Sequence, residues 1–137
     1  MDNLIVIEPE DCDSYQLPEG VLMVGRSDQF LSIGFMEVEP GRSLGKQVSP
    51  VPGIFSQVEG KPVFRIEGRG EPTEVALSKG ETVKVPSGIP YTVTNPSTGK
   101  CLVSWRFEGD VSGMFEKLKE QFPLIPPEPS KKTRKKR

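Results

Sequence analysis

The side chains that most often perform acid–base and metal chemistry are scarce in this chain. It contains no histidine and only two cysteines, Cys12 and Cys101, which lie far apart. Histidine titrates near neutral pH and is the commonest metal ligand. Without it, Ser49 and Ser104 have no base that would activate them as nucleophiles. Cys101 begins an apolar segment, so we expect a core residue rather than a nucleophile.

Three other polar residues could bind a ligand. Arg65, Tyr91 and Arg106 each lie within a segment that is expected to form a strand. An arginine that points inward beside Tyr91 would bind a small anion, whereas one that points outward would be a solvated surface residue. The strand register decides the face, so both interpretations stay open.

The most informative stretch is residues 80–95, GETVKVPSGIPYTVTN, which predicts a strand, a tight turn and a second strand. β-Branched residues fill both halves, and Pro86, Ser87 and Gly88 form the turn. The spacing of its glycines, proline and asparagine resembles the second signature motif of the cupin barrels. Metal-binding cupins have a histidine where this chain has Tyr91.

The resemblance to cupins extends to an earlier glycine frame, from Gly41 to Gly60. In metal-binding cupins this frame carries two histidines and a glutamate. Tyrosine would have to ionise to bind a metal strongly, and its usual pKa is about 10. We therefore expect neither a metal nor another cofactor. The four degenerate ligand positions are Gln47, Ser49, Gly53 and Tyr91.

Short segments rich in strand-forming residues, separated by turns at regular intervals, predict an all-β fold. A content of 14 glycines and 14 prolines fits this better than a helical bundle. The resemblance implies a cupin double-stranded β-helix, which is a jelly-roll-like antiparallel barrel. Strands are expected over residues 4–7, 21–24, 30–38, 54–58, 62–67, 73–76, 82–85, 91–95 and 100–107.

One C-terminal α-helix is expected after the last strand. Five apolar residues recur there at helical spacing, namely Val111, Met114, Phe115, Leu118 and Phe122. The segment 41–53 is expected to be a connection. The expected organisation is an N-terminal extension with short strands (1–24), the barrel (25–109), the helix (110–122), and a Pro-rich arm and basic tail that are disordered (123–137).

The net charge of −1 conceals a basic tail. Residues 1–130 contain 19 acidic and 12 basic side chains. This excess of negative charge would repel nucleic acid. The tail is open to interpretation as a nuclear import signal, a weak nucleic-acid contact or a soluble terminus. We expect a soluble intracellular protein, with no contact to a membrane. The tail contains Lys131, Lys132, Arg134, Lys135, Lys136 and Arg137.

Apolar residues occur on both faces of several expected strands. A monomer would leave one of these faces exposed to water, so the pattern favours a homodimer. The residues expected at the dimer interface are Leu4, Val6, Ile33, Phe35, Leu102, Trp105 and Phe107.

Three segments together resemble the C-terminal cupin domain of centromere protein C, a scaffold of the inner kinetochore. They are GFMEVEPGRSLGKQ, FSQVEGKPVFRIEG and LSKGETVKVPSGIPYTVTN. The resemblance implies a domain that is not an enzyme and that homodimerises, bringing two copies together on centromeric chromatin in the nucleus. It also implies a docking surface for kinetochore or centromere-loading proteins.

A different hypothesis is a metal-free cupin that binds or isomerises a small polar ligand inside the barrel. The residues that would contact the ligand are Gln47, Arg65 and Tyr91. This hypothesis requires a cavity on which polar groups converge.

Overall fold

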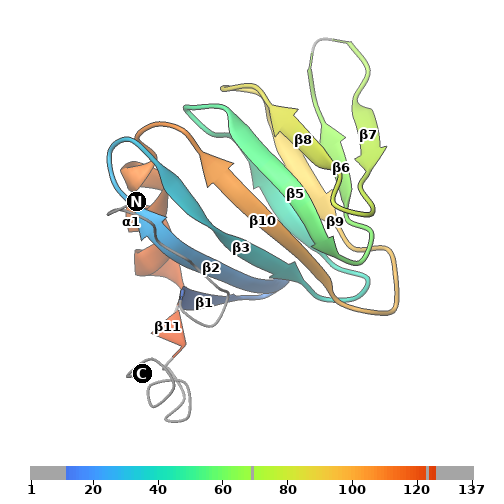
Figure 1. The fold of residues 1–137 in the computed structure, drawn as a ribbon, viewed down its shortest axis with the longest axis horizontal. Helices are drawn as coiled ribbons and strands as arrows, with labels where there is room; N and C mark the ends of the chain where they lie inside the picture. Colours follow the sequence, from blue (N-terminus) through green and yellow to red (C-terminus); the bar gives the residue numbers. More distant parts are fainter. Residues whose placement is uncertain (1–11, 69, 123, 126–137) are drawn as a thin grey trace, which may run out of the picture.

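The structure is a computed structural model, and it describes residues 12–68, 70–122 and 124–125. Two antiparallel sheets face each other, and one helix lies beside an end of the larger sheet (Figure 1). The prediction of an all-β fold with a C-terminal helix is therefore confirmed.

The two sheets contain seven and four strands within the described residues. In spatial order, the larger sheet consists of β11 (Leu124–Ile125), β1 (Asp13–Leu17), β2 (Gly20–Ser27), β3 (Ser32–Val38), β10 (Cys101–Phe107), β5 (Gly53–Glu59) and β8 (Thr82–Val85). The smaller sheet consists of β4 (Ser43–Gln47), β9 (Tyr91–Thr94), β6 (Val63–Ile66) and β7 (Thr73–Ala76).

Alternation along the strands places the core between the sheets. On β3 and β10 every second residue is buried, as expected for strands with one face against a core. The ring of Phe55 on β5 lies 5.0 Å from that of Phe64 and 5.1 Å from that of Tyr91, both on the smaller sheet. It also lies 5.8 Å from the ring of Phe107. This aromatic cluster therefore joins the two sheets through the burial of large apolar surfaces.

A buried asparagine links the end of β9 to the larger sheet. The side chain of Asn95 donates hydrogen bonds to the carbonyl oxygens of Val38 (2.9 Å) and Gly99 (2.7 Å). Its own oxygen accepts from the amide (3.0 Å) and the hydroxyl (2.7 Å) of Ser97. Asn95 is completely buried, so these bonds satisfy polar groups that water does not reach.

The structure adds three strands that the sequence analysis did not predict. β4 lies in the expected connection 41–53, β1 lies in the expected extension, and β11 lies in the expected disordered arm. All three are short, and β1 and β4 are largely polar, so their sequences carry little strand pattern. Pairing with neighbouring strands determines their structure instead. The expected boundary at residue 25 falls inside β2, which pairs with β3. The expected strand over residues 4–7 lies outside the described residues.

The helix α1 (Ser112–Gln121) packs on the barrel mainly through Phe115, whose ring lies 5.5 Å from that of Trp105. The carboxylate of Asp110 accepts hydrogen bonds from the hydroxyl (2.7 Å) and the amide (3.0 Å) of Ser112, which lower the pKa of Asp110.

In the part of the chain that the structure describes, no helix has the length and apolarity of a membrane-spanning segment.

Candidate functional site

A cavity of about 520 Å³ lies between the sheets beside α1, and we call it the barrel cavity. Small-molecule sites typically have volumes of about 300–1,000 Å³. Both sheets and α1 contribute to its walls, which are mostly apolar. Its polar lining residues are Glu19, Gln47, Tyr91, Lys117 and Gln121.

Tyr91 is the most buried of these polar residues, with 5% of its surface exposed. Among the described residues, no hydrogen bond involves its hydroxyl group. Every completely buried side-chain oxygen or nitrogen there does have a partner. The Tyr91 hydroxyl must therefore be open to the barrel cavity that the residue lines. Burial raises the pKa of Tyr91 well above its ordinary value, so the hydroxyl is a neutral hydrogen-bond donor at neutral pH.

Two of the four degenerate ligand positions meet at the barrel cavity. Gln47 and Tyr91 are register partners on β4 and β9, and both line the cavity. Gln47 is exposed, and its amide nitrogen donates to the carbonyl of Gly45 (3.2 Å). It therefore lies at the rim, whereas Tyr91 lies in the interior.

The other two positions, Ser49 and Gly53, have structural roles. The buried hydroxyl of Ser49 accepts a hydrogen bond from the amide of Val51 (3.2 Å). A Cβ atom on Gly53 would lie 2.8 Å from a ring carbon of Phe107 and 2.9 Å from one of Phe55. The space that a glutamate would need at this position is filled by two aromatic rings.

These residues do not fit a metal ion. A neutral amide and a tyrosine that stays protonated are weak ligands for the metals that cupins bind through histidine and glutamate. No group of three or more His, Cys, Asp or Glu side chains could hold a metal ion within the described ranges. We therefore derive no chemistry that depends on a metal.

Both arginines point outward. Arg65 on β6 is exposed and pairs with Glu74 (3.3 Å). Arg106 on β10 is exposed and pairs with Glu108 (3.5 Å). The hypothesis that one of them lies beside Tyr91 is wrong, because the neighbours of each on its strand are the residues that face the core.

Cys101 is confirmed as a core residue. It is completely buried, and burial raises the pKa of its thiol. A thiol with a raised pKa is a poor nucleophile at neutral pH.

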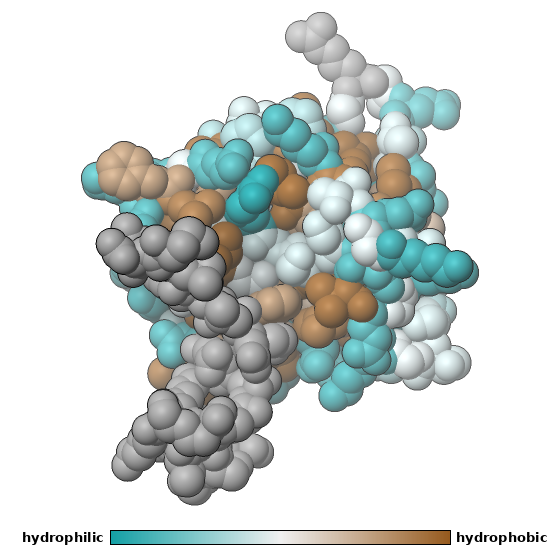
Figure 2. Space-filling model, in the orientation of Figure 1, coloured by the Kyte–Doolittle hydropathy of each residue, from teal (hydrophilic) through white to brown (hydrophobic). Residues whose placement is uncertain are grey.

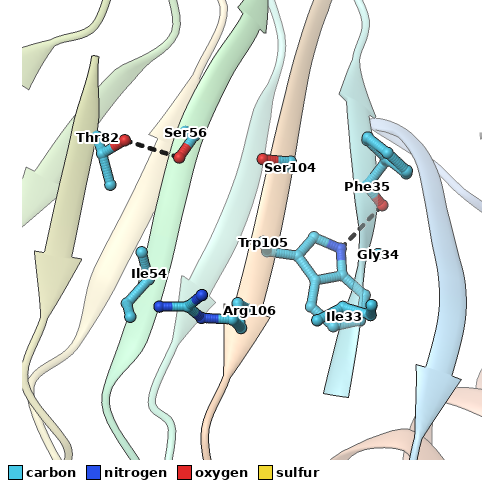
Figure 3. Close-up of a pocket in the computed structure, with 9 residues that line it drawn as sticks. All are labelled: Ile33, Gly34, Phe35, Ile54, Ser56, Thr82, Ser104, Trp105 and Arg106. Atoms are coloured by element: carbon cyan, nitrogen blue, oxygen red, sulfur yellow. Dashed lines mark hydrogen bonds between the residues drawn. The ribbon is translucent and has the colours of Figure 1, made fainter. Parts of the chain in front are cut away.

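A second hollow, of about 460 Å³, lies on the outer face of the larger sheet, and we call it the outer groove. Figure 2 shows apolar residues around this paler hollow. Hydroxyl groups line its floor, where Ser56 and Thr82 share a hydrogen bond of 2.7 Å (Figure 3). The indole nitrogen of Trp105 donates to the carbonyl of Phe35 (2.9 Å). The lining residues are Ile33, Gly34, Phe35, Ile54, Ser56, Thr82, Ser104, Trp105 and Arg106.

Opposite charges lie at the two ends of the outer face. The register aligns Arg26, Arg106 and Lys84 across the sheet, separated by isoleucines, and we call them the basic row. Toward the other end of the strands, Glu37 and Glu59 flank Leu102 as the acidic row. Between them lies a middle row of Phe35, Ser104, Ser56 and Thr82. Register partners share a face of the sheet, so the three rows form one surface.

Comparison with known proteins gives a match at the level of structure. Protein-family models give no match, and curated proteins give none by sequence. A solved structure of oxalate decarboxylase has a TM-score of 0.64 and 17% identity, over 69% of this chain and 27% of that one. Oxalate oxidase in complex with glycolate has a TM-score of 0.55 and 18% identity, over 58% and 42%. A cupin domain from Bordetella pertussis has a TM-score of 0.57 and 16% identity, over 68% and 96%.

The chain has a cupin fold. The prediction made from residues 80–95 is thereby confirmed at the level of the fold. The match spans less than half the length of oxalate oxidase and oxalate decarboxylase. The comparisons do not show the resemblance of this chain to centromere protein C, which stays a prediction.

These structures correct the expectation that the chain is not an enzyme. Oxalate oxidase and oxalate decarboxylase are enzymes with the same fold. The absence of histidine limits the chemistry of this chain, but its fold is one that enzymes use.

The structure separates the residues that were expected at a dimer interface. Trp105 and Phe107 are buried at 3% and 4% exposure, with rings 5.5 Å apart inside the barrel, so their placement on an interface is wrong. Their strand alternates, and the residues between them face outward instead. Ile33, Phe35 and Leu102 lie half-buried on the outer face.

The remaining predicted site residues lie outside the described residues. They are Leu4 and Val6, and the basic tail of Lys131, Lys132, Arg134, Lys135, Lys136 and Arg137. Sequence reasoning missed the contribution of α1 to the cavity wall, because the apolar stripe of the helix predicts burial but not its location.

Proposed function

We propose that this cupin binds a small ligand in the barrel cavity. The observation that carries the proposal is the hydroxyl group of the largely buried Tyr91, which lacks a hydrogen-bond partner among the described residues and opens into the cavity. A ligand that accepts a hydrogen bond from this hydroxyl would gain about 0.5–1.5 kcal/mol, which is the usual net contribution of one hydrogen bond.

The surroundings of Tyr91 support a binding site in which packing supplies much of the affinity. Phe55, Trp105 and Phe107 line the same cavity, and large apolar side chains with a few polar groups are typical of ligand sites. Arg65 lies elsewhere on the surface, so the ligand would not need to be an anion.

Butylbenzene would test whether the cavity accepts a ligand. Trp105 is the single tryptophan of the chain and lines both the barrel cavity and the outer groove, so its indole N–H signal in a ¹⁵N-labelled sample reports binding at either one, and an effect of substitution at Gln47 assigns the binding to the cavity. We expect a saturable shift of this signal. Gln47→Phe should weaken binding by about tenfold because it narrows the rim, which corresponds to about 1.4 kcal/mol.

Lys46→Phe is the matched control, since Lys46 is the exposed neighbour of Gln47 on β4 and does not line the cavity. It should leave the affinity for butylbenzene unchanged. If the indole signal of the folded protein did not respond to butylbenzene, the proposed binding site would be wrong.

A second candidate function is homodimerisation through the outer face. Two copies could pack with their outer faces together and with the strands of one copy antiparallel to those of the other. The basic row of each copy would then lie against the acidic row of its partner. The middle rows would then meet each other and bury Phe35. An isologous dimer requires this kind of self-complementarity.

Arg106→Glu should therefore weaken the dimer at least about tenfold, because it places a negative charge in the basic row. Sedimentation at micromolar concentration would measure this. Arg65→Glu is the matched control, because Arg65 is also an exposed strand arginine paired with a glutamate, but on the smaller sheet. Equal effects of the two variants, or a monomeric parent protein, would rule out the outer face as the interface.

The resemblance to centromere protein C gives this second candidate a cellular role, which is to bring two copies together on centromeric chromatin and to dock kinetochore or centromere-loading proteins. A fluorescent fusion that stays away from centromeres would exclude this role. Weak binding of nucleic acid by the basic tail is a separate proposal, for which deletion of residues 131–137 should remove salt-dependent binding.

A further inference from the structure

We propose that the ligand of the barrel cavity is a neutral, largely apolar molecule whose one hydrogen-bond acceptor, such as a carbonyl oxygen, is bound by the Tyr91 hydroxyl. This inference rests on the proposed function and adds the chemical class of the ligand. It departs from the alternative hypothesis of the sequence analysis, in which the ligand is small and polar.

The walls near Tyr91 favour an apolar body. Met36, Leu44 and Phe55 line the cavity and are at least 92% buried. Each Å² of apolar ligand surface that they cover contributes roughly 25 cal/mol. A strongly polar ligand would lose its hydration there and gain few hydrogen bonds in return.

The polar group of the ligand is determined by what Tyr91 lacks. Its hydroxyl can donate one hydrogen bond, and no described residue accepts it. A carbonyl or ether oxygen on the ligand would do so. Gln47, the other former ligand position in the cavity, is exposed at the rim and already donates to Gly45.

The charges around the cavity disfavour a ligand with an anionic group beside Tyr91. Among the described residues that line the cavity, the one basic residue is Lys117, and it is exposed. The acidic lining residue, Glu19, is only half-buried. A carboxylate bound at Tyr91 would therefore be desolvated without a cation beside it, which is costly.

Three probes of similar shape test this class: butylbenzene without an acceptor, butyrophenone with a carbonyl, and 4-butylbenzoate with a charge. The shift of the Trp105 indole signal would give the three affinities. We expect butyrophenone to bind about fivefold to tenfold more tightly than butylbenzene, and 4-butylbenzoate to bind most weakly. Tyr91→Phe should remove the advantage of butyrophenone and change the affinity for butylbenzene by less than about twofold.

The outcomes are distinct. If butylbenzene and butyrophenone bind the unmodified protein equally, or if 4-butylbenzoate binds best, the ligand class is wrong while the binding site stands. If none of the three binds, the proposed function itself fails. The ranking in the unmodified protein decides the question even if Tyr91→Phe does not fold.

Discussion

Replacing Asn95 by aspartate is expected to lower the free energy of unfolding by about 4 kcal/mol at neutral pH, since a buried donor is lost and a charge is left without a partner. The introduced carboxylate would face the carbonyl oxygens of Val38 and Gly99, which now accept from the Asn95 amide. Urea denaturation at pH 8 and at pH 4 would measure the loss.

The pH dependence follows from the sign of the pKa change. Burial beside two carbonyl oxygens would raise the pKa of the introduced carboxyl group in the folded state above its unfolded value of about 4. The extra loss of stability should therefore develop as the pH rises above the pKa of the carboxyl group in the unfolded state. It should become constant above the pKa of this group in the folded state. Asn95→Ala is the control, with a loss of about 3 kcal/mol that does not depend on pH. Identical pH profiles for the two variants would contradict this account of Asn95.

Phe55→Ala is the second large effect, with an expected loss of about 4 kcal/mol. Phe55 is 1% exposed, and its ring contacts the rings of Phe64, Tyr91 and Phe107. Its removal would leave a void where the two sheets meet, and thermal or urea unfolding would show the loss.

Val58→Ala is the control on the same strand, because Val58 is 48% exposed. Its effect should stay within about 0.5 kcal/mol. If Phe55→Ala cost no more than Val58→Ala, the aromatic cluster would not be what joins the sheets.

The barrel was predictable from the sequence because its strands carry strong local signals. The expected limits of the strands over residues 73–76 and 82–85 agree with β7 and β8. The segment from Pro86 to Asn95 combines turn formers with β-branched residues, so propensity and pattern predict the same structure there. The absence of histidine ligands can be read from the composition alone, since no arrangement supplies histidine to a chain without it.

The site was less predictable, because a one-residue change of register exchanges the two faces of a strand. Apolar residues occupy both faces of β10, so its pattern did not show that Trp105 and Phe107 face inward while Leu102 faces outward. The same ambiguity hid the outward position of Arg65. The free hydroxyl of Tyr91 depends on what surrounds it in three dimensions, which no local pattern encodes.

The tight packing at Gly53 would hinder the introduction of a metal centre into this barrel. The rings of Phe55 and Phe107 lie within 3 Å of where a first side-chain carbon would stand at Gly53. Placing histidines and a glutamate at the four degenerate ligand positions would thus not create a metal centre, since two phenylalanines would also have to become smaller. Each replacement of a phenylalanine by a smaller residue would weaken the core on its own, so a metal centre would require several changes at once.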